Sequence, residues 1–277
     1  MMTDATNYQG DLLQVRSEKI APFGICNLSV IPVRAEASDK SEIVSQLLFG
    51  ETVEVLEQRD NWTRVKVLYD DYEGWISTKQ FFGLDKEELN EINNRQSFVC
   101  TSPFNFLTNA LGHSHYLSPG STLPLFRGDS VFLGDEKYYF KGKAYVTDSF
   151  PRKNMESLFK MFLNAPYLWG GRSILGIDCS GFTQVCFKIL GVKLKRDANQ
   201  QAEQGDLVSF ITEGKLGDLA FFDNAEGRIT HVGILLNNHQ IIHASGKVRI
   251  DSIDHQGIFN NDTQQYTHKL RIIKRLI

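Results

Sequence analysis

The feature that most constrains the fold is the stretch 167–191, where a glycine-rich run leads into a cysteine and then an apolar helix. It reads YLWGG at 167–171 and GIDCSGF at 176–182. Phe182, Val185 and Ile189 follow at spacings of three and four, which predicts a helix with one inward-facing side. Gly191 is suited to ending that helix. The fold must therefore hold a loop-to-helix junction against a core.

Cys179 lies in the first turn of this predicted helix. Unpaired backbone N–H groups and the helix dipole favour negative charge there, so we expect a thiol biased toward the nucleophilic thiolate. Asp178, directly before it, is a candidate N-cap. Local context alone leaves open both a nucleophile and a buried structural cysteine. Cys100 and Cys186 are interpreted as core residues, since Cys186 continues the apolar repeat.

Two histidines occupy mirrored positions in a predicted β-hairpin. Residues 217–222 form a short apolar strand, and two further β-rich runs flank an Asn-Asn turn at 237–238. His231 and His243 each lie six residues from Asn237, so we expect their side chains to meet. Such a pair suits a base and its orienting partner. Zinc is the rival reading, but one cysteine and two histidines without carboxylate spacing support it weakly. We expect no cofactor.

Five motifs, in this order, closely resemble the NlpC/P60 family of papain-like cysteine peptidases: YLWGG, GIDCSGF, GDLAFF, HVGI and IHAS. The resemblance covers 151–277 and implies an α+β domain, with a helix packed on an antiparallel sheet. By that likeness Cys179 is the nucleophile, His231 the general base and His243 the third, polar member of the site.

The resemblance also implies a substrate site around the nucleophile. Tyr167 would line it and help the Cys179 N–H steady an oxyanion. Trp169, Asp178 and Ser180 are further expected substrate-binding residues. Members of the family typically hydrolyse bonds in bacterial cell-wall (murein) peptides, often between the γ-carboxyl of D-Glu and a diamino acid.

Short strands and turns precede this domain. After a polar lead-in (1–19), residues 20–83 alternate strands and turns as small barrels do, and their order resembles a bacterial SH3-like (SH3b) domain. Residues 84–97 include a short charged helix, interpreted as a connector. Residues 98–150 repeat the β character and are expected to form a second barrel. No low-complexity linker divides these parts, which favours rigid packing.

The composition limits which partners the protein can bind and in which cellular compartment we expect it. A net charge of −3 without any Lys/Arg-rich run argues against nucleic acid. Four scattered cysteines are too few for a disulfide framework. No stretch resembles a transmembrane span, and the start lacks the basic head and apolar run of a signal peptide. We expect a cytoplasmic monomer. An exported protein already trimmed of its signal is the alternative.

The SH3b resemblance also indicates what the barrels do. One reading is a generic cell-wall anchor. In relatives specialised for recycling wall fragments, the first barrel walls off the cleft and reads the substrate's free amino end. Asp197 lies at the segment those relatives use for the amine, and Ala198 beside it offers only a backbone contact. Glu73 and Tyr116 are barrel-side candidates, with ordinary solvent-facing roles equally open.

The function expected from these observations is a γ-D-glutamyl-L-diamino acid endopeptidase acting on murein peptides with a free N-terminal L-Ala. Arg172 and Arg196 are candidates for pairing with substrate carboxylates. Two alternatives stay open: a cell-wall amidase or D,D-peptide cleaver of the same fold acting on intact wall, and a non-catalytic wall-binding protein. The diamino acid, diaminopimelate or Lys, is left undecided.

Overall fold

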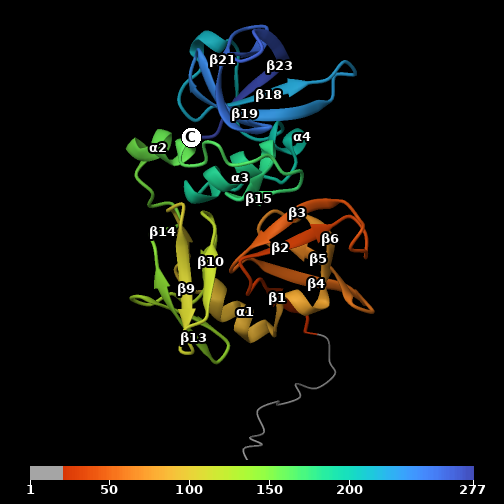
Figure 1. The fold of residues 1–277 in the computed structure, drawn as a ribbon, viewed down its shortest axis with the longest axis vertical. Coiled ribbons are helices and arrows are strands. Elements are labelled where there is room, and N and C mark those ends of the chain that lie inside the picture. The colour runs from red at the N-terminus through yellow and green to blue at the C-terminus, as the bar shows by residue number, and fades with distance from the viewer. Residues whose placement is uncertain (1–20) are drawn as a thin grey trace, which may run out of the picture.

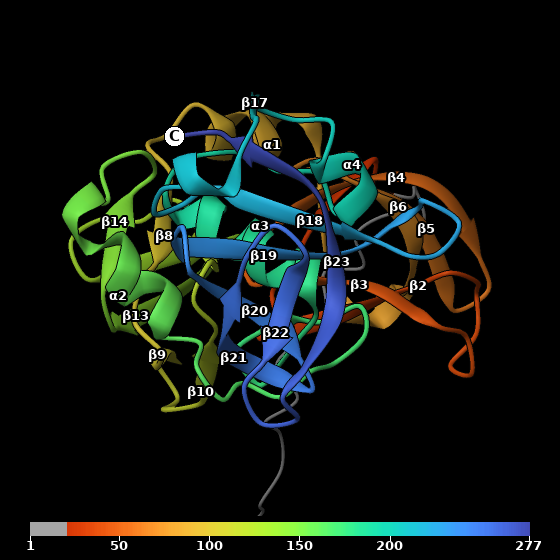
Figure 2. The ribbon, with the colours of Figure 1, turned by 90° about the horizontal axis from the view of Figure 1, so that it is seen from above.

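The computed structural model describes residues 21–277, so the predicted lead-in over 1–19 lies outside the described residues. Figure 1 shows two β-rich regions side by side below a central helix, with a third sheet above it. In the view from above, strands β18 and β19 cross over that helix, α3 (Figure 2). The helix therefore lies between the C-terminal sheet and the two N-terminal β regions.

The first region is a seven-stranded sheet in the order β3-β2-β6-β5-β4-β1-β7. In β5, residues 63, 65 and 67 are buried and alternate with more exposed neighbours. The polar face of that strand contacts water while the other face builds the core. The elements are β1 (Phe23–Ile25), β2 (Val30–Arg34), β3 (Ile43–Leu48), β4 (Thr52–Arg59), β5 (Trp62–Val67), β6 (Glu73–Ser77), η1 (Thr78–Gln80) and β7 (Phe82–Leu84).

Helix α1 (Lys86–Asn93) connects this sheet to the second region, and Asp85 and Glu88 form a capping box at its start. The second region contains two small sheets, ordered β10-β9-β13-β12 and β11-β8-β14. Its strands are β8 (Phe98–Cys100), β9 (Asn105–Asn109), β10 (Ser114–Leu117), β11 (Thr122–Leu123), β12 (Ser130–Leu133), β13 (Glu136–Lys141) and β14 (Ala144–Val146).

The C-terminal region pairs helix α3 with a seven-stranded antiparallel sheet ordered β17-β23-β18-β19-β20-β21-β22. The expected α+β class is confirmed, and an added pairing of β22 with β23 closes the sheet into a barrel. The elements are η2 (Arg152–Asn154), α2 (Met155–Lys160), β15 (Arg172–Ser173), β16 (Gly176–Ile177), α3 (Cys179–Ile189), α4 (Ala198–Gln201), β17 (Asp206–Val208), η3 (Ile211–Glu213), β18 (Leu219–Asp223), β19 (Ile229–Asn237), β20 (Gln240–Ser245), β21 (Lys247–Ile253), β22 (Gly257–Asn260) and β23 (Gln265–Arg275).

Helix α3 is buried along its whole length, and Gly191 follows it with φ +78°, as a helix-terminating glycine requires. Its predicted apolar side packs into one core with α2 and the strands of the C-terminal sheet. Cys186 belongs to that core, as predicted. Because every face of α3 is covered, the residue at its start is held in a fixed position.

The first sheet joins the C-terminal region through buried charges. The Glu51 carboxylate accepts hydrogen bonds from Arg172 at 2.6 and 2.9 Å and from the Lys188 Nζ at 2.7 Å. All three side chains are at most 7% exposed. The first and second β regions also share an apolar core that includes Ile25 and Leu107. Buried contacts therefore fix the N-terminal regions against the helix that carries Cys179.

Candidate active site

Cys179 is the first residue of α3, and the turn before it is held by Asp178. Asp178 Oδ1 accepts from the Gly181 N–H at 2.6 Å, and Oδ2 accepts from the Gly170 N–H at 2.9 Å. The predicted N-cap is thus present, and it ties the glycine-rich loop to the helix. The Cys179 N–H belongs to the first turn, where backbone donors have no partner within the helix.

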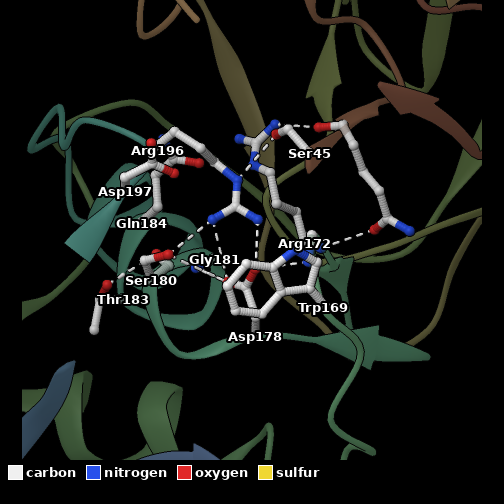
Figure 3. Close-up of polar contacts among 12 residues, drawn as sticks. Ser45, Trp169, Arg172, Asp178, Ser180, Gly181, Thr183, Gln184, Arg196 and Asp197 are labelled. Carbon is white, nitrogen blue, oxygen red and sulfur yellow. Dashed lines mark hydrogen bonds and ion pairs between the residues drawn. The ribbon is translucent and has the colours of Figure 1, made fainter. Parts of the chain in front are cut away.

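Arg196 fixes Asp178 from the other side (Figure 3). Its guanidinium donates to both Asp178 oxygens, at 3.1 and 2.6 Å, and also to the Ser180 Oγ at 2.8 Å and the Ser45 Oγ at 3.0 Å. Arg196 and Arg172 are both buried in such internal pairs. The expectation that they bind substrate carboxylates is therefore wrong, because both guanidinium groups are buried and already paired with carboxylates of the protein, Arg172 with Glu51 and Arg196 with Asp178.

The Cys179 thiol is buried beside these charges. Burial, followed by the charge of Asp178, raises the pKa of Cys179 to about 12. The N–H groups of Val232 and Ser180 and the charge of Arg196 act in the opposite direction. Burial at this position therefore acts against the thiolate that the helix terminus was expected to favour. A neighbouring base must remove the thiol proton during a reaction.

His231 and His243 meet as the hairpin predicted, with a different register. The His231 Nε2 lies 2.9 Å from the His243 Nδ1. The residue opposite His243 is Gly233, because the turn lies at 238–239 and the pairing of β19 and β20 shifts by one residue beside it. A Cβ on Gly233 would lie 2.8 Å from the His243 Cβ. The glycine therefore leaves room for the two rings to meet diagonally.

Asp251, on the next strand β21, extends this pair, and the sequence analysis missed it. The His243 Nε2 lies 3.0 Å from Asp251 Oδ2, and Arg249 donates to both oxygens of Asp251. Burial opposes the charge of Asp251, but hydrogen bonds from His243, Arg249 and the Asn261 N–H hold its pKa well below the usual range.

An ionised Asp251 fixes the tautomers along the chain. It can only accept, so His243 donates from Nε2 and accepts at Nδ1. His231 then donates from Nε2, which leaves the Nδ1 lone pair of His231 free to take a proton. Burial, with His243 and His268 nearby, lowers the pKa of His231 well below its usual value. The two pKa shifts act in the same sense, and both favour the neutral form of the thiol and of the imidazole.

A pocket of about 480 Å³ opens at Cys179 between the first sheet and the C-terminal region. The structure brings most of the predicted site residues to its wall, namely Tyr167, Trp169, Asp178, Cys179, Ser180, Asp197 and Ala198. It also brings Glu42, Val44 and Tyr72 from the first β region, which the sequence analysis did not single out. The Trp169 Nε1 donates to the Glu42 carboxylate at 2.5 Å.

The structure does not bring Glu73 or Tyr116 to this pocket. Glu73 pairs with Arg64 on an exposed face of the first sheet, at 2.7 Å. Tyr116 lies in the second region, where its hydroxyl donates to the Pro103 carbonyl. Tyr72, the immediate neighbour of Glu73, takes the place in the pocket. Tyr72 directly precedes β6, of which Glu73 is the first residue, so the residue before the strand reaches the pocket.

Within residues 21–277, no group of three or more His, Cys, Asp or Glu side chains is arranged to hold a metal ion. No helix in that same part of the chain is long and apolar enough to cross a membrane.

Comparison with known proteins agrees with this geometry. The model of the NlpC/P60 family matches residues 164–267. The γ-D-glutamyl-L-lysine dipeptidyl-peptidase of Bacillus subtilis (strain 168) is 31% identical over 226 residues, which cover 73% of this chain and 72% of that protein. The chain belongs to the NlpC/P60 family. It is a cysteine peptidase, as the motifs predicted.

Other NlpC/P60 relatives extend the match beyond the peptidase domain. Dipeptidyl-peptidase 6 of Lysinibacillus sphaericus is 26% identical, over 80% of this chain and 88% of that protein. A crystal structure of an NlpC/P60 family protein from Bacillus cereus ATCC 10987 superposes with a TM-score of 0.77 at 22% identity, covering 91% of this chain and 99% of that one, so the fold is shared. The model of the bacterial dipeptidyl-peptidase Sh3 domain matches residues 33–81, where an SH3b domain was expected.

Proposed function

We propose that the protein is a γ-D-glutamyl-L-diamino acid endopeptidase that acts on short murein peptides with a free N-terminal L-Ala. The names of the relatives from Bacillus subtilis and Lysinibacillus sphaericus support a dipeptidyl-peptidase. The observation that carries the proposal is the acidic end of the pocket, where the first sheet and α4 meet next to Cys179.

That end of the pocket suits an ammonium group. Asp197 and Glu42 both line it, and neither forms an ion pair within residues 21–277. The Asp197 carboxylate interacts with the Tyr72 hydroxyl. Burial raises the pKa of Asp197, and Arg196 offsets this only in part. A substrate ammonium would supply the missing positive charge, and hydrogen bonds to ionised groups are the stronger ones.

The first half of the reaction acylates Cys179. The His231 Nδ1 takes the thiol proton as the sulfur attacks the γ-carbonyl carbon of D-Glu. In this proposal the Cys179 N–H and the Tyr167 hydroxyl donate to the resulting oxyanion, which is supported by the presence of both residues in the pocket wall. Collapse breaks the carbon–nitrogen bond, and His231 returns the proton to the leaving amine. The products of this half are a thioester and the free diamino acid.

The second half hydrolyses the thioester. His231 takes a proton from water as the oxygen adds to the thioester carbonyl, and the carbon–sulfur bond then breaks. The sulfur regains its proton, and L-Ala-D-Glu leaves with a new γ-carboxylate. His243 and Asp251 hold the same tautomer of His231 in both halves, since neither exchanges a proton with the substrate.

We expect Asp251→Asn to lower kcat by about 10- to 100-fold, because an amide no longer dictates which His243 nitrogen carries the proton. The measurement is kcat across pH, beside a thermal melt that reports folding. The control is Asp262→Asn, which removes the exposed carboxylate that also pairs with Arg249. A kcat within twofold of wild type for Asp251→Asn would contradict the proposed orientation of His231.

We expect acetylation of the substrate amine to lower kcat/KM about 100-fold, because it removes the charge that Asp197 and Glu42 would bind and adds bulk at the acidic end of the pocket. L-Ala-γ-D-Glu-L-Lys and its N-acetyl twin are the substrates. Asp197→Asn should reduce the difference in kcat/KM between the free and the acetylated substrate. Equal rates on both substrates in the wild type would reject recognition of the amine.

Mass spectrometry of the products tests the reaction itself. The proposal predicts L-Ala-D-Glu and the free diamino acid from the tripeptide, and little release from intact wall. Release of L-Ala from muramic acid would instead identify an amidase. Binding to wall sacculi with no product from either substrate would identify a non-catalytic wall-binding protein.

A further inference from the structure

We propose that a second pocket, on the far side of Tyr167 and Thr230 from the acidic pocket, is the subsite for the leaving diamino acid, and that His268 is its specificity-determining residue. This inference rests on the proposed function. The pocket measures about 250 Å³ and is lined by Tyr167, Thr230, His231, Ala244, Ser245, Gly246 and His268.

The position of the pocket follows from the order of groups along the cleft. The acidic end contains Asp197, and Cys179 lies within the same pocket. Tyr167 and Thr230 line both pockets, so the two share a wall. His231, the base that returns a proton to the leaving amine, lines only the second. A substrate anchored by its amine at Asp197 and attacked at Cys179 therefore extends its leaving residue into the second pocket.

His268, on β23, offers this pocket a hydrogen-bond acceptor. In this proposal the Thr267 hydroxyl donates to the Ile258 carbonyl, 3.4 Å away, and its oxygen accepts from the His268 Nδ1 at 2.8 Å. The proton of His268 is thus on Nδ1, and Nε2 carries a lone pair. Nε2 has no hydrogen-bond partner within residues 21–277. Burial, followed by His243, lowers the pKa of His268 to about 4, so the ring is neutral at neutral pH.

The lining also indicates which chemistry the pocket accepts. It contains no Lys or Arg, so nothing there matches an additional substrate carboxylate. The His268 lone pair and the Ser245 hydroxyl accept hydrogen bonds from N–H groups. The pocket therefore suits a leaving residue that presents amino groups, as L-lysine does, better than one that carries a second carboxylate.

His268 also stacks on His231, with ring centroids 4.2 Å apart and planes inclined by 28°. A substitution could therefore act through the base rather than through the leaving residue. His268→Phe separates the two effects, because phenylalanine keeps an aromatic ring against His231 but removes the acceptor. His268→Gln does the opposite, since it loses the ring and keeps an acceptor.

The test compares two substrates that share one acyl part, L-Ala-γ-D-Glu-L-Lys and L-Ala-γ-D-Glu methylamide. We expect His268→Phe to lower kcat/KM for the lysine substrate about tenfold more than for the methylamide, the effect of one lost hydrogen bond. His268→Gln should restore part of this discrimination. His239→Phe, on the exposed hairpin turn, is the matched control and should leave kcat/KM unchanged for both substrates.

If His268→Phe lowers kcat/KM equally for both substrates, or for neither, the assignment of His268 is overturned. The proposed function still stands in that case, provided that the wild type cleaves the substrates. If the wild type cleaves neither substrate, the proposed function fails and this inference fails with it. If His268→Phe does not fold, the same two substrates are compared with His268→Gln. If this variant, which keeps an acceptor, no longer prefers the lysine substrate over the methylamide at all, the acceptor role of His268 is contradicted.

Discussion

Replacing Cys179 with alanine is expected to lower kcat by about 10⁴-fold or more, because the attacking sulfur is lost and, within the described residues, no other thiol lines the pocket. Folding should survive, since one small side chain is removed while the Asp178 cap and Arg196 remain in place. The measurement is product formation from the free tripeptide, with a thermal melt beside it.

Cys186→Ala is the matched control for that experiment. Cys186 lies on the same helix, fully buried in the core and away from the pocket. The loss of its sulfur should cost roughly 1 kcal/mol of stability through the space left behind. Its kcat should stay within twofold of wild type. Wild-type activity in Cys179→Ala would reject the assigned nucleophile, whatever the control shows.

The largest effect on stability is expected from Glu51→Gln. This change leaves Arg172 and Lys188 buried without the carboxylate that neutralises them, and breaking a buried ion pair from one side costs about 3–5 kcal/mol. Denaturant unfolding measures the loss. Because Lys188 lies near the end of the helix that begins with Cys179, activity should fall together with stability.

The same carboxylate predicts how stability depends on pH. Burial disfavours the charge of Glu51, but Arg172 and Lys188 outweigh it and lower the pKa from 4.5 to about 2. A depressed pKa in the folded state means that the contribution is complete above about pH 4.5 and is lost as the pH falls toward 2. Glu51→Gln should therefore flatten the stability profile over that range.

Glu57→Gln provides the comparison for Glu51. Glu57 pairs with Arg59 on the surface of the same sheet, with side chains 39% and 61% exposed. Exposed pairs contribute about 0–1 kcal/mol, so this variant should unfold close to the wild type. A loss for Glu51→Gln no larger than for Glu57→Gln would mean that the buried charges do not hold the regions together.

Much of the site could be predicted from local sequence because its parts are local. The helix from Cys179, its Asp178 cap and the histidine hairpin each depend on spacings of a few residues. Asp251 was missed because it lies on the following strand, β21, two residues beyond Arg249, which pairs with His243. A second hairpin turning at Gly246 is the signal that would have found it.

The errors have a different physical origin, since they concern burial and distant partners. Arg172 and Glu51 are 121 positions apart, so no local pattern reveals that they pair. The protonation of Cys179 depends on how completely the barrel and the first sheet exclude water, which is a property of the packed fold. Glu73 does not reach the pocket because it pairs with Arg64 on the exposed face of the first sheet, while Tyr72, the residue before β6, lines the pocket.

The central claim, attack by the Cys179 sulfur on a γ-glutamyl carbonyl, is tested most directly by acid-quenching the protein during turnover of L-Ala-γ-D-Glu-L-Lys and measuring its intact mass. The account predicts an added L-Ala-γ-D-Glu acyl group that maps to the peptide containing Cys179 and is absent from Cys179→Ala. Turnover with an adduct on another residue, or an adduct that persists in Cys179→Ala, would contradict it.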